Sequence, residues 1–127
     1  MKHKATVFVF GLLAMCFIFT NKTSANKPTV TIEAPSSVVK GSEITIKINV
    51  EHNSNSFSHY VNWAYISVNG KDIARWDFSA SKRPEGNNFS REVKYKTLTA
   101  PTEIEAEANC NIHGSKGKVT YTLSIEK

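Results

Sequence analysis

Hydrophobic and polar residues alternate in short runs along the chain, which is typical of β-strands with one buried and one solvated face. The clearest run is residues 44–50, where isoleucine or valine at every second position alternates with threonine, lysine and asparagine. No stretch of useful length has the spacing of an amphipathic helix. The pattern predicts about seven strands, at residues 29–34, 44–50, 60–68, 72–78, 91–98, 103–109 and 119–125.

Turn-forming residues separate these predicted strands. Asn69-Gly70 lies between two of them and is the pair most typical of a tight β-hairpin, since both residues tolerate a positive φ. Residues 79–88 are polar and include Pro84 and Gly86, so we expect them to form a loop. About seven short strands in roughly 100 residues are typical of an immunoglobulin-like β-sandwich. We therefore predict an all-β fold of that class.

The first 25 residues have a different character. A basic start, MKHK, precedes a nearly uninterrupted apolar run at residues 5–20, and small residues follow at 23–25. This order is typical of a secretory signal peptide, and the apolar run is shorter than the roughly 20 residues that span a bilayer. We predict a signal peptide at residues 1–25 and one domain at residues 26–127, secreted or periplasmic and free of the membrane after cleavage.

Charge excludes one class of partner. Three of the 16 basic residues and none of the 11 acidic ones lie in residues 1–25, which leaves 13 basic residues against 11 acidic ones, a net charge of +2. An excess this small, without a basic cluster, gives no reason to expect nucleic acid binding. The sequence leaves the oligomeric state open, with a homo-oligomer among the alternatives.

The chemistry of the domain depends on its single cysteine, Cys110. Exported proteins usually pair their thiols, but here no partner exists, so Cys110 is a buried inert thiol, a reactive or intermolecular thiol, or a metal ligand. We favour a ligand because His113 follows at C-x-x-H spacing, and thiolate with imidazole suits iron, copper or zinc. His52 and His59 border one polar loop, and loops converge at the ends of a sandwich.

Two segments carry a resemblance to a known family. His59-Tyr60-Val61-Asn62-Trp63 and Cys110-Asn111-Ile112-His113-Gly114 resemble the iron-binding domain of superoxide reductases, the desulfoferrodoxin and neelaredoxin group. The likeness extends from about Thr29 to Gly114. It implies an immunoglobulin-like sandwich with one mononuclear iron, Fe2+ or Fe3+, for which Cys110 is the axial ligand and His52, His59 and His113 are equatorial ligands. It also implies reduction of superoxide to hydrogen peroxide, with an external electron donor that re-reduces the iron.

The chain departs from the family near the start of the domain. The family has a fourth equatorial histidine in a Glu-Lys-His setting, and the matching stretch here is Asn26-Lys27-Pro28-Thr29, so one imidazole is missing. Lys27 lies roughly where the family has a lysine, and the resemblance implies a catalytic role for it in steering the superoxide anion. Cleavage after Ala25 would leave a free α-amine on Asn26 near the place of the missing histidine.

Two other classes of function stay open. A non-catalytic metal-binding or electron-transfer module, such as a type 1 copper protein, also combines a β-sandwich with a C-x-x-H motif and an upstream histidine. Its usual axial methionine has no counterpart, because Met1 and Met15 both lie in the predicted signal. A metal-free adhesion or carrier domain would need only the strand pattern. We expect an exported iron protein that reduces superoxide.

Overall fold

The computed structural model describes residues 26–96 and 101–126. The signal peptide expected at residues 1–25 lies outside this part, as does the end of the strand expected at 91–98. No helix long and apolar enough to cross a membrane occurs in the described residues. They form nine strands: β1 (Thr29–Glu33), β2 (Ser37–Val39), β3 (Glu43–Glu51), β4 (Val61–Val68), β5 (Lys71–Asp77), β6 (Asn88–Lys96), β7 (Thr102–Cys110), β8 (Gly114–Ser115) and β9 (Val119–Glu126).

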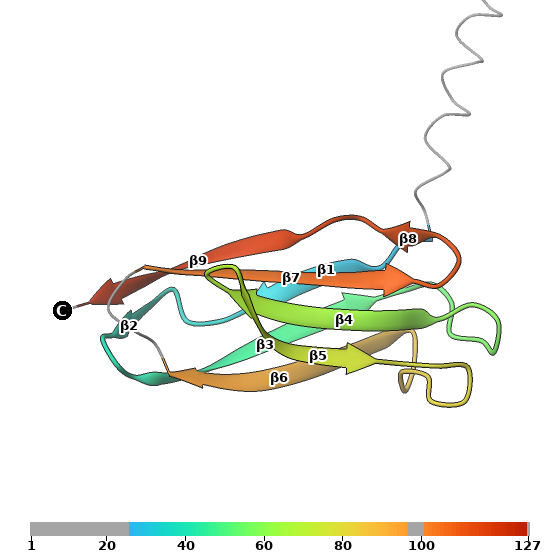
Figure 1. Cartoon of the computed structure of the whole chain (residues 1–127), viewed down its shortest axis with the longest axis horizontal. Coiled ribbons are helices and arrows are strands. Elements are labelled where there is room, and N and C mark those ends of the chain that lie inside the picture. The colour runs from blue at the N-terminus through green and yellow to red at the C-terminus, as the bar shows by residue number, and fades with distance from the viewer. Residues whose placement is uncertain (1–25, 97–100, 127) are drawn as a thin grey trace, which may run out of the picture.

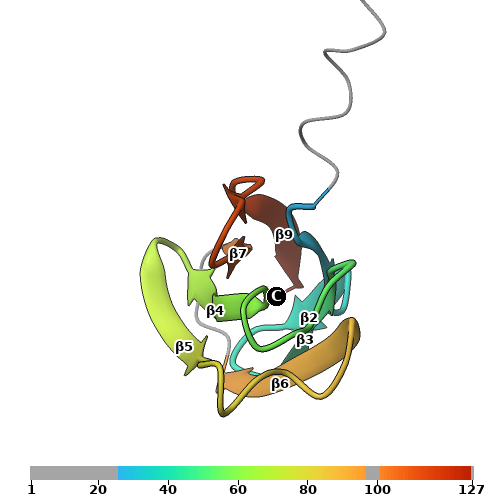
Figure 2. The ribbon, with the colours of Figure 1, turned by 90° about the vertical axis from the view of Figure 1, so that its right-hand side faces the viewer.

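The strands form two sheets that face each other (Figure 1, Figure 2). One sheet has three strands in the order β1-β3-β6, and the other has the order β2-β9-β7-β4-β5, with β8 paired to β7. All pairs are antiparallel except β2 with β9. The predicted immunoglobulin-like β-sandwich is confirmed. The seven expected strands are all present, and the two additional ones, β2 and β8, are only three and two residues long.

The core lies between the sheets and is built from alternate residues of the central strands. In β3 these are Ile44, Ile46, Ile48 and Val50, each at most 4% exposed. The opposing sheet contributes small and branched side chains from β4 and β7, namely Ala64, Ile66, Val68, Ile104, Ala106 and Ala108. The expected alternation in β3 is therefore confirmed, and it fixes which side chains face outward.

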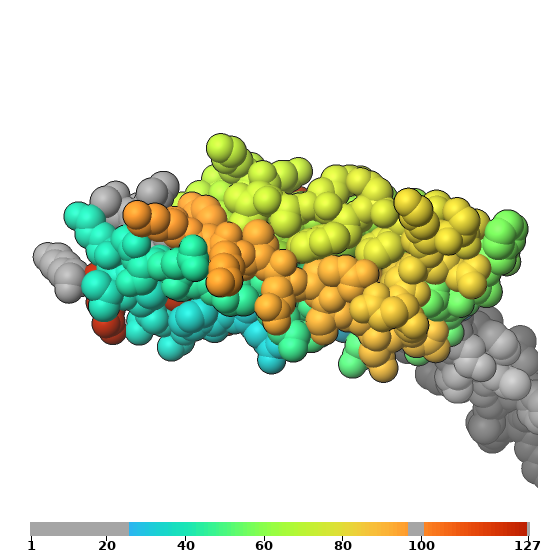
Figure 3. Space-filling view, turned by 90° about the horizontal axis from the view of Figure 1, so that it is seen from below, coloured from blue at the N-terminus to red at the C-terminus, as the bar shows by residue number. Residues whose placement is uncertain are grey.

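Two predicted turns have the expected backbone. Asn69 and Gly70, which join β4 to β5, have φ values of 50° and 83°, as a tight hairpin of this type requires. Residues 79–87 form an irregular loop that carries one isolated bridge, between Ser79 and Lys82. Figure 3 shows this loop in yellow beside the green loop that precedes β4, at one end of the elongated molecule.

Aromatic side chains lie on both faces of the larger sheet. Trp76 packs against the core. On the other face, Trp63 stacks on Tyr65 with ring centroids 5.8 Å apart, and the guanidinium of Arg75 lies 5.2 Å from the centroid of the Trp63 ring. Burial, followed by a hydrogen bond to Glu107, raises the pKa of Tyr65 to about 12. The outward face of β4 is thus covered by its own aromatic pair.

The packing of Ile66 yields a stability prediction. Ile66 is fully buried at the centre of the core, so Ile66→Ala should lower the free energy of unfolding by about 2–5 kcal/mol, through lost burial and a residual cavity. Urea denaturation measures this. Val39, 55% exposed in β2, is the control, and Val39→Ala should change the stability by less than about 0.5 kcal/mol. Similar losses for both variants would contradict the assigned core.

Candidate metal centre

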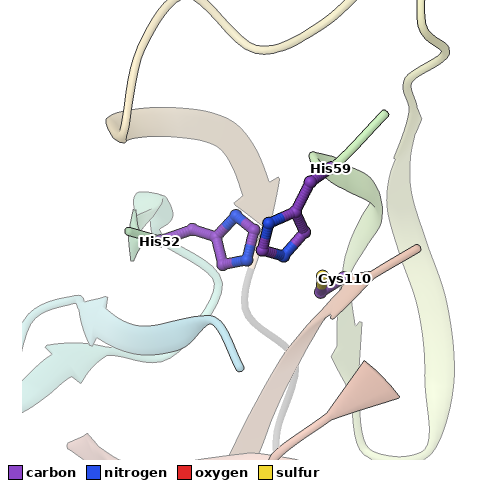
Figure 4. Close-up of side chains that lie close together, drawn as sticks. All are labelled: His52, His59 and Cys110. Atoms are coloured by element: carbon purple, nitrogen blue, oxygen red, sulfur yellow. The ribbon is translucent and has the colours of Figure 1, made fainter. Parts of the chain in front are cut away.

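The candidate ligands all lie at one end of the sandwich. His52 directly follows β3 and is 4% exposed, and the main-chain N–H of His52 donates to the carbonyl of Asn87 at 2.8 Å. His59 lies in the loop that leads into β4, and Cys110 is the last residue of β7 and only 1% exposed. His113 lies in the turn between β7 and β8. Figure 4 shows the side chains of His52, His59 and Cys110 pointing toward one another from three different segments.

The donor atoms of these residues converge. One ligand atom from each of His52, His59 and Cys110 lies within 4.8 Å of the other two. His113 joins them, because its Nδ1 is 3.1 Å from Nε2 of His59 and 3.7 Å from Sγ of Cys110. The structure therefore brings together all four side chains that the sequence grouped, and their role as metal ligands stays a prediction.

The turn after β7 holds the sulfur of Cys110 among main-chain donors. The N–H groups of Ile112 and His113 both donate to Sγ, each at 3.4 Å. Gly114 has a φ of 83° and lets the chain reverse into β8 directly after His113. Cys110 is unpaired and buried. Hydrogen bonds of this kind stabilise negative charge on a thiolate and tune a metal bound to it.

The side chain of Asn111 joins the two halves of the site. Its Oδ1 accepts the N–H of Tyr60 at 2.9 Å, and its Nδ2 donates to the carbonyl of Ser58 at 3.1 Å. The main-chain N–H of Asn111 also donates to the carbonyl of Tyr60 at 3.1 Å. These three hydrogen bonds hold the main chain on both sides of His59. Asn111 therefore positions the imidazole of His59 near Cys110.

His52 has one nitrogen engaged and one without a partner. Its Nε2 lies 3.0 Å from the carbonyl oxygen of Asn26. Its Nδ1 is buried and has no hydrogen-bond partner within the described residues, although buried imidazole nitrogens are usually satisfied. The ring therefore faces the main chain of Asn26 with Nε2, and Nδ1 lacks a partner among the described residues.

The electrostatic setting favours a neutral ring at His59. Its pKa is lowered from the ordinary value of 6.5, first because the ring is desolvated and then because protonated His52 and His113 would repel its charge. Three imidazoles grouped this closely repel one another if all are protonated to the cationic form. Neutral imidazole is the form that binds metals. The cluster is therefore suited to binding a metal cation.

The donor set fits a mononuclear iron. His59 Nε2 and His113 Nδ1 lie 3.1 Å apart, which is close enough for both to bind one ion. One thiolate with three imidazoles is a borderline to soft set, unlike the all-oxygen sets of calcium and magnesium.

Lys27 is the least defined of the predicted site residues. It follows Asn26, whose carbonyl contacts His52, so its main chain lies at the rim of the centre, with a half-buried side chain. Its catalytic role stays a prediction. Sequence reasoning missed the positioning role of Asn111, even though Asn111 lies within the C-x-x-H motif, because that role depends on how β7 meets the loop before β4.

Comparisons with known proteins agree with this fold. Together, the two facing sheets and the cysteine–histidine cluster define an immunoglobulin-like domain with a candidate metal centre. A family model described as Desulfoferrodoxin matches residues 20–116. The chain therefore belongs to the desulfoferrodoxin family. A search of curated proteins returned no match.

Solved structures show the same fold in several settings. The superoxide reductase (neelaredoxin) of Ignicoccus hospitalis is similar at 20% identity, over 77% of this chain and 80% of that chain, with a TM-score of 0.58. A single-residue variant of that protein gives 20% identity, coverage of 84% and 86%, and a TM-score of 0.61. A CARDB domain from Pyrococcus furiosus gives 15% identity, coverage of 79% and 93%, and a TM-score of 0.58. At these identities the similarity shows the fold alone.

The bonds of Asn111 predict an effect on metal affinity. Asn111→Ala should weaken Fe2+ binding about 10- to 100-fold, because partners that orient a ligand typically contribute that much. Asn111→Asp keeps the acceptor for Tyr60 and loses the donor to Ser58. Its affinity for Fe2+ should therefore lie between that of the unaltered protein and that of Asn111→Ala. Anaerobic chelator competition measures the dissociation constants.

A matched control for Asn111 exists at the far end of β4. The Oδ1 of Asn69 also accepts a main-chain N–H, from Glu103 at 2.8 Å. Asn69→Ala should lower the stability and leave the affinity for Fe2+ unchanged. If both alanine variants lost affinity equally, general destabilisation would explain the result and the positioning role would be wrong.

The lowered pKa of His59 predicts how acid affects the metal-free protein. An unfolded histidine takes up its proton near pH 6.5, whereas folded His59 does so only at lower pH. The contribution of His59 to stability is therefore fully present above about pH 6.5 and is lost as the pH falls toward its folded pKa. When the pH falls from 7 to 5, urea denaturation should show a smaller loss of stability for His59→Gln than for the unaltered protein. Equal losses in both proteins would count against the assignment.

Proposed function

We propose that this protein is an exported mononuclear iron protein that reduces superoxide to hydrogen peroxide. The observation that carries the proposal is the convergence of Cys110 with three imidazoles, from His52, His59 and His113, in a chain of the desulfoferrodoxin family. The similar Ignicoccus hospitalis protein is a superoxide reductase, which supports the same reaction here. A bound ferrous ion would supply one electron to superoxide, and two protons taken from water complete hydrogen peroxide.

The protein side chains have separate tasks in this reaction. The sulfur of Cys110, as a thiolate, adds electron density to the metal, and the N–H groups of Ile112 and His113 hold that sulfur in place. The imidazoles are neutral ligands. The centre therefore combines one negative ligand with neutral ones, which favours release of an electron from the metal.

Positive charge at the rim would help to attract the anionic substrate. Lys27 lies beside Asn26 at the edge of the centre, and Nζ of Lys116 donates to Oγ1 of Thr29 at 2.7 Å. A cationic rim raises the local concentration of an anion and its rate of encounter, in a salt-dependent way. We assign Lys27 the steering role on these grounds.

The reaction needs an electron donor, and the rim offers a surface for one. Ile112, between Cys110 and His113, is 61% exposed, and Phe57, in the loop before His59, is 72% exposed. The bond from Asn111 to the carbonyl of Ser58 ties these two loops together. Two exposed apolar side chains next to the ligands support close approach by a donor protein.

Export is part of the proposal and rests on the sequence of residues 1–25. Its basic start, apolar run and small residues before position 26 are those of a cleaved signal peptide. A secreted or periplasmic location is also compatible with a single cysteine that is bound to a metal and so cannot form unwanted disulfides.

Replacement of Cys110 tests the proposed function. The iron-loaded, oxidised protein should show a visible thiolate-to-iron absorption band, and the reduced protein should be oxidised by a pulse of superoxide. Cys110→Ser should lose the band and at least about 100-fold of the rate, since a hydroxyl is not a thiolate donor. Ile112→Ser is the matched control, because it puts the same serine in the same turn and leaves every donor in place.

The outcomes separate the candidate functions. A band without a reaction with superoxide would indicate a non-catalytic iron or electron-transfer module. A protein that binds no iron when Cys110 and the three histidines are intact would refute the proposal.

A further inference from the structure

The main chain of Asn26 lies against the metal centre. Its carbonyl oxygen is 3.0 Å from Nε2 of His52, a ring that is 4% exposed. The side chain of Pro28 is fully buried, and Thr29 opens β1 and accepts a hydrogen bond from Lys116. The segment that leads from Asn26 into the sandwich is therefore fixed by packing, and the fold itself sets the position of Asn26.

The donors described so far do not fill the coordination sphere of iron. Three imidazoles and one thiolate make four ligands, whereas non-haem Fe2+ with mainly histidine ligands can keep open positions for further donors, up to six in total. One further position is needed for the substrate. Another is then available to a donor from the protein, and the main chain of Asn26 lies next to His52.

A chain that begins at Asn26 would carry a suitable donor at this place. Its primary amine, which has a pKa of about 8, is a neutral nitrogen donor once deprotonated. The amine nitrogen and the carbonyl oxygen of one residue are joined through two carbon atoms and lie at most about 3.6 Å apart. Because the carbonyl oxygen lies 3.0 Å from Nε2 of His52, the amine is close enough to take the one remaining position.

We propose that the α-amine of Asn26, freed by cleavage after Ala25, is a ligand of this metal centre, with the Asn26 carbonyl oxygen beside it. The inference rests on the proposed function, because it requires that Cys110 and the histidines hold a metal. A carbonyl that served only to orient His52 would need the main chain of Asn26 but not a free amine. That difference can be measured.

The experiment compares the processed protein with a variant that carries Gly-Ser inserted between Ala25 and Asn26. The insertion keeps the Asn26 carbonyl and all side-chain donors, and it turns the α-amine into an amide. Mass spectrometry identifies the first residue of each purified protein. Anaerobic chelator competition gives the dissociation constant for Fe2+, and the visible spectrum of the oxidised form reports on the ligand set.

We expect the extended variant to bind Fe2+ at least about tenfold more weakly and its thiolate-to-iron band to shift. A Gly-Ser extension after Lys127 is the matched control: it adds the same two residues and leaves the α-amine free, so it should bind as the unaltered protein does. Equal affinities and spectra in the processed and extended proteins would overturn the inference and leave the metal centre standing. A first residue other than Asn26 would also overturn it. A lack of Fe2+ binding in all forms would refute the proposed function, and this inference with it.

Discussion

The pairing of β7 with β4 is the constraint on which the candidate site depends. Its register places Val61, the first residue of β4, opposite Cys110, the last residue of β7, and an irregularity follows between Val61 and Trp63. The loop before β4 and the turn after β7 must therefore meet at one edge. Asn111 then joins them through its bonds to Ser58 and Tyr60, which brings His59 to the sulfur. A shift of register by one residue would turn Cys110 away from the core.

Much of this architecture could be predicted because it depends on local patterns of hydrophobic, polar and turn-forming residues. The alternation of residues 44–50 identified β3 and its buried face, and Asn69-Gly70 identified the hairpin. The short strands β2 and β8 could not be found, since two or three residues show no alternation. Trp63 stacks outward on Tyr65. Its side of the sheet depends on the irregular pairing near Val61, which leaves no local signal in the sequence.

The fold by itself says little about function, because sandwiches of this kind also occur in proteins as different as the CARDB domain of Pyrococcus furiosus. What sets this chain apart is confined to its loops and strand ends. The residue types of the site were recognisable from C-x-x-H and the two upstream histidines. The supporting contacts, such as that between His52 and the carbonyl of Asn26, join residues far apart in the sequence and emerge only from the folded chain.

His52 extends from the three-stranded sheet, whereas Cys110 and His113 extend from the other sheet. An ion that binds all of them would act as a clasp across the open end of the sandwich, so metal supply and resistance to unfolding would be thermodynamically linked. A shortage of the metal would then remove the activity and also shorten the lifetime of the protein. Without the ion, this end of the sandwich would unfold locally more often and be open to proteases. In this way one small cluster would make the amount of protein follow the amount of metal available to it.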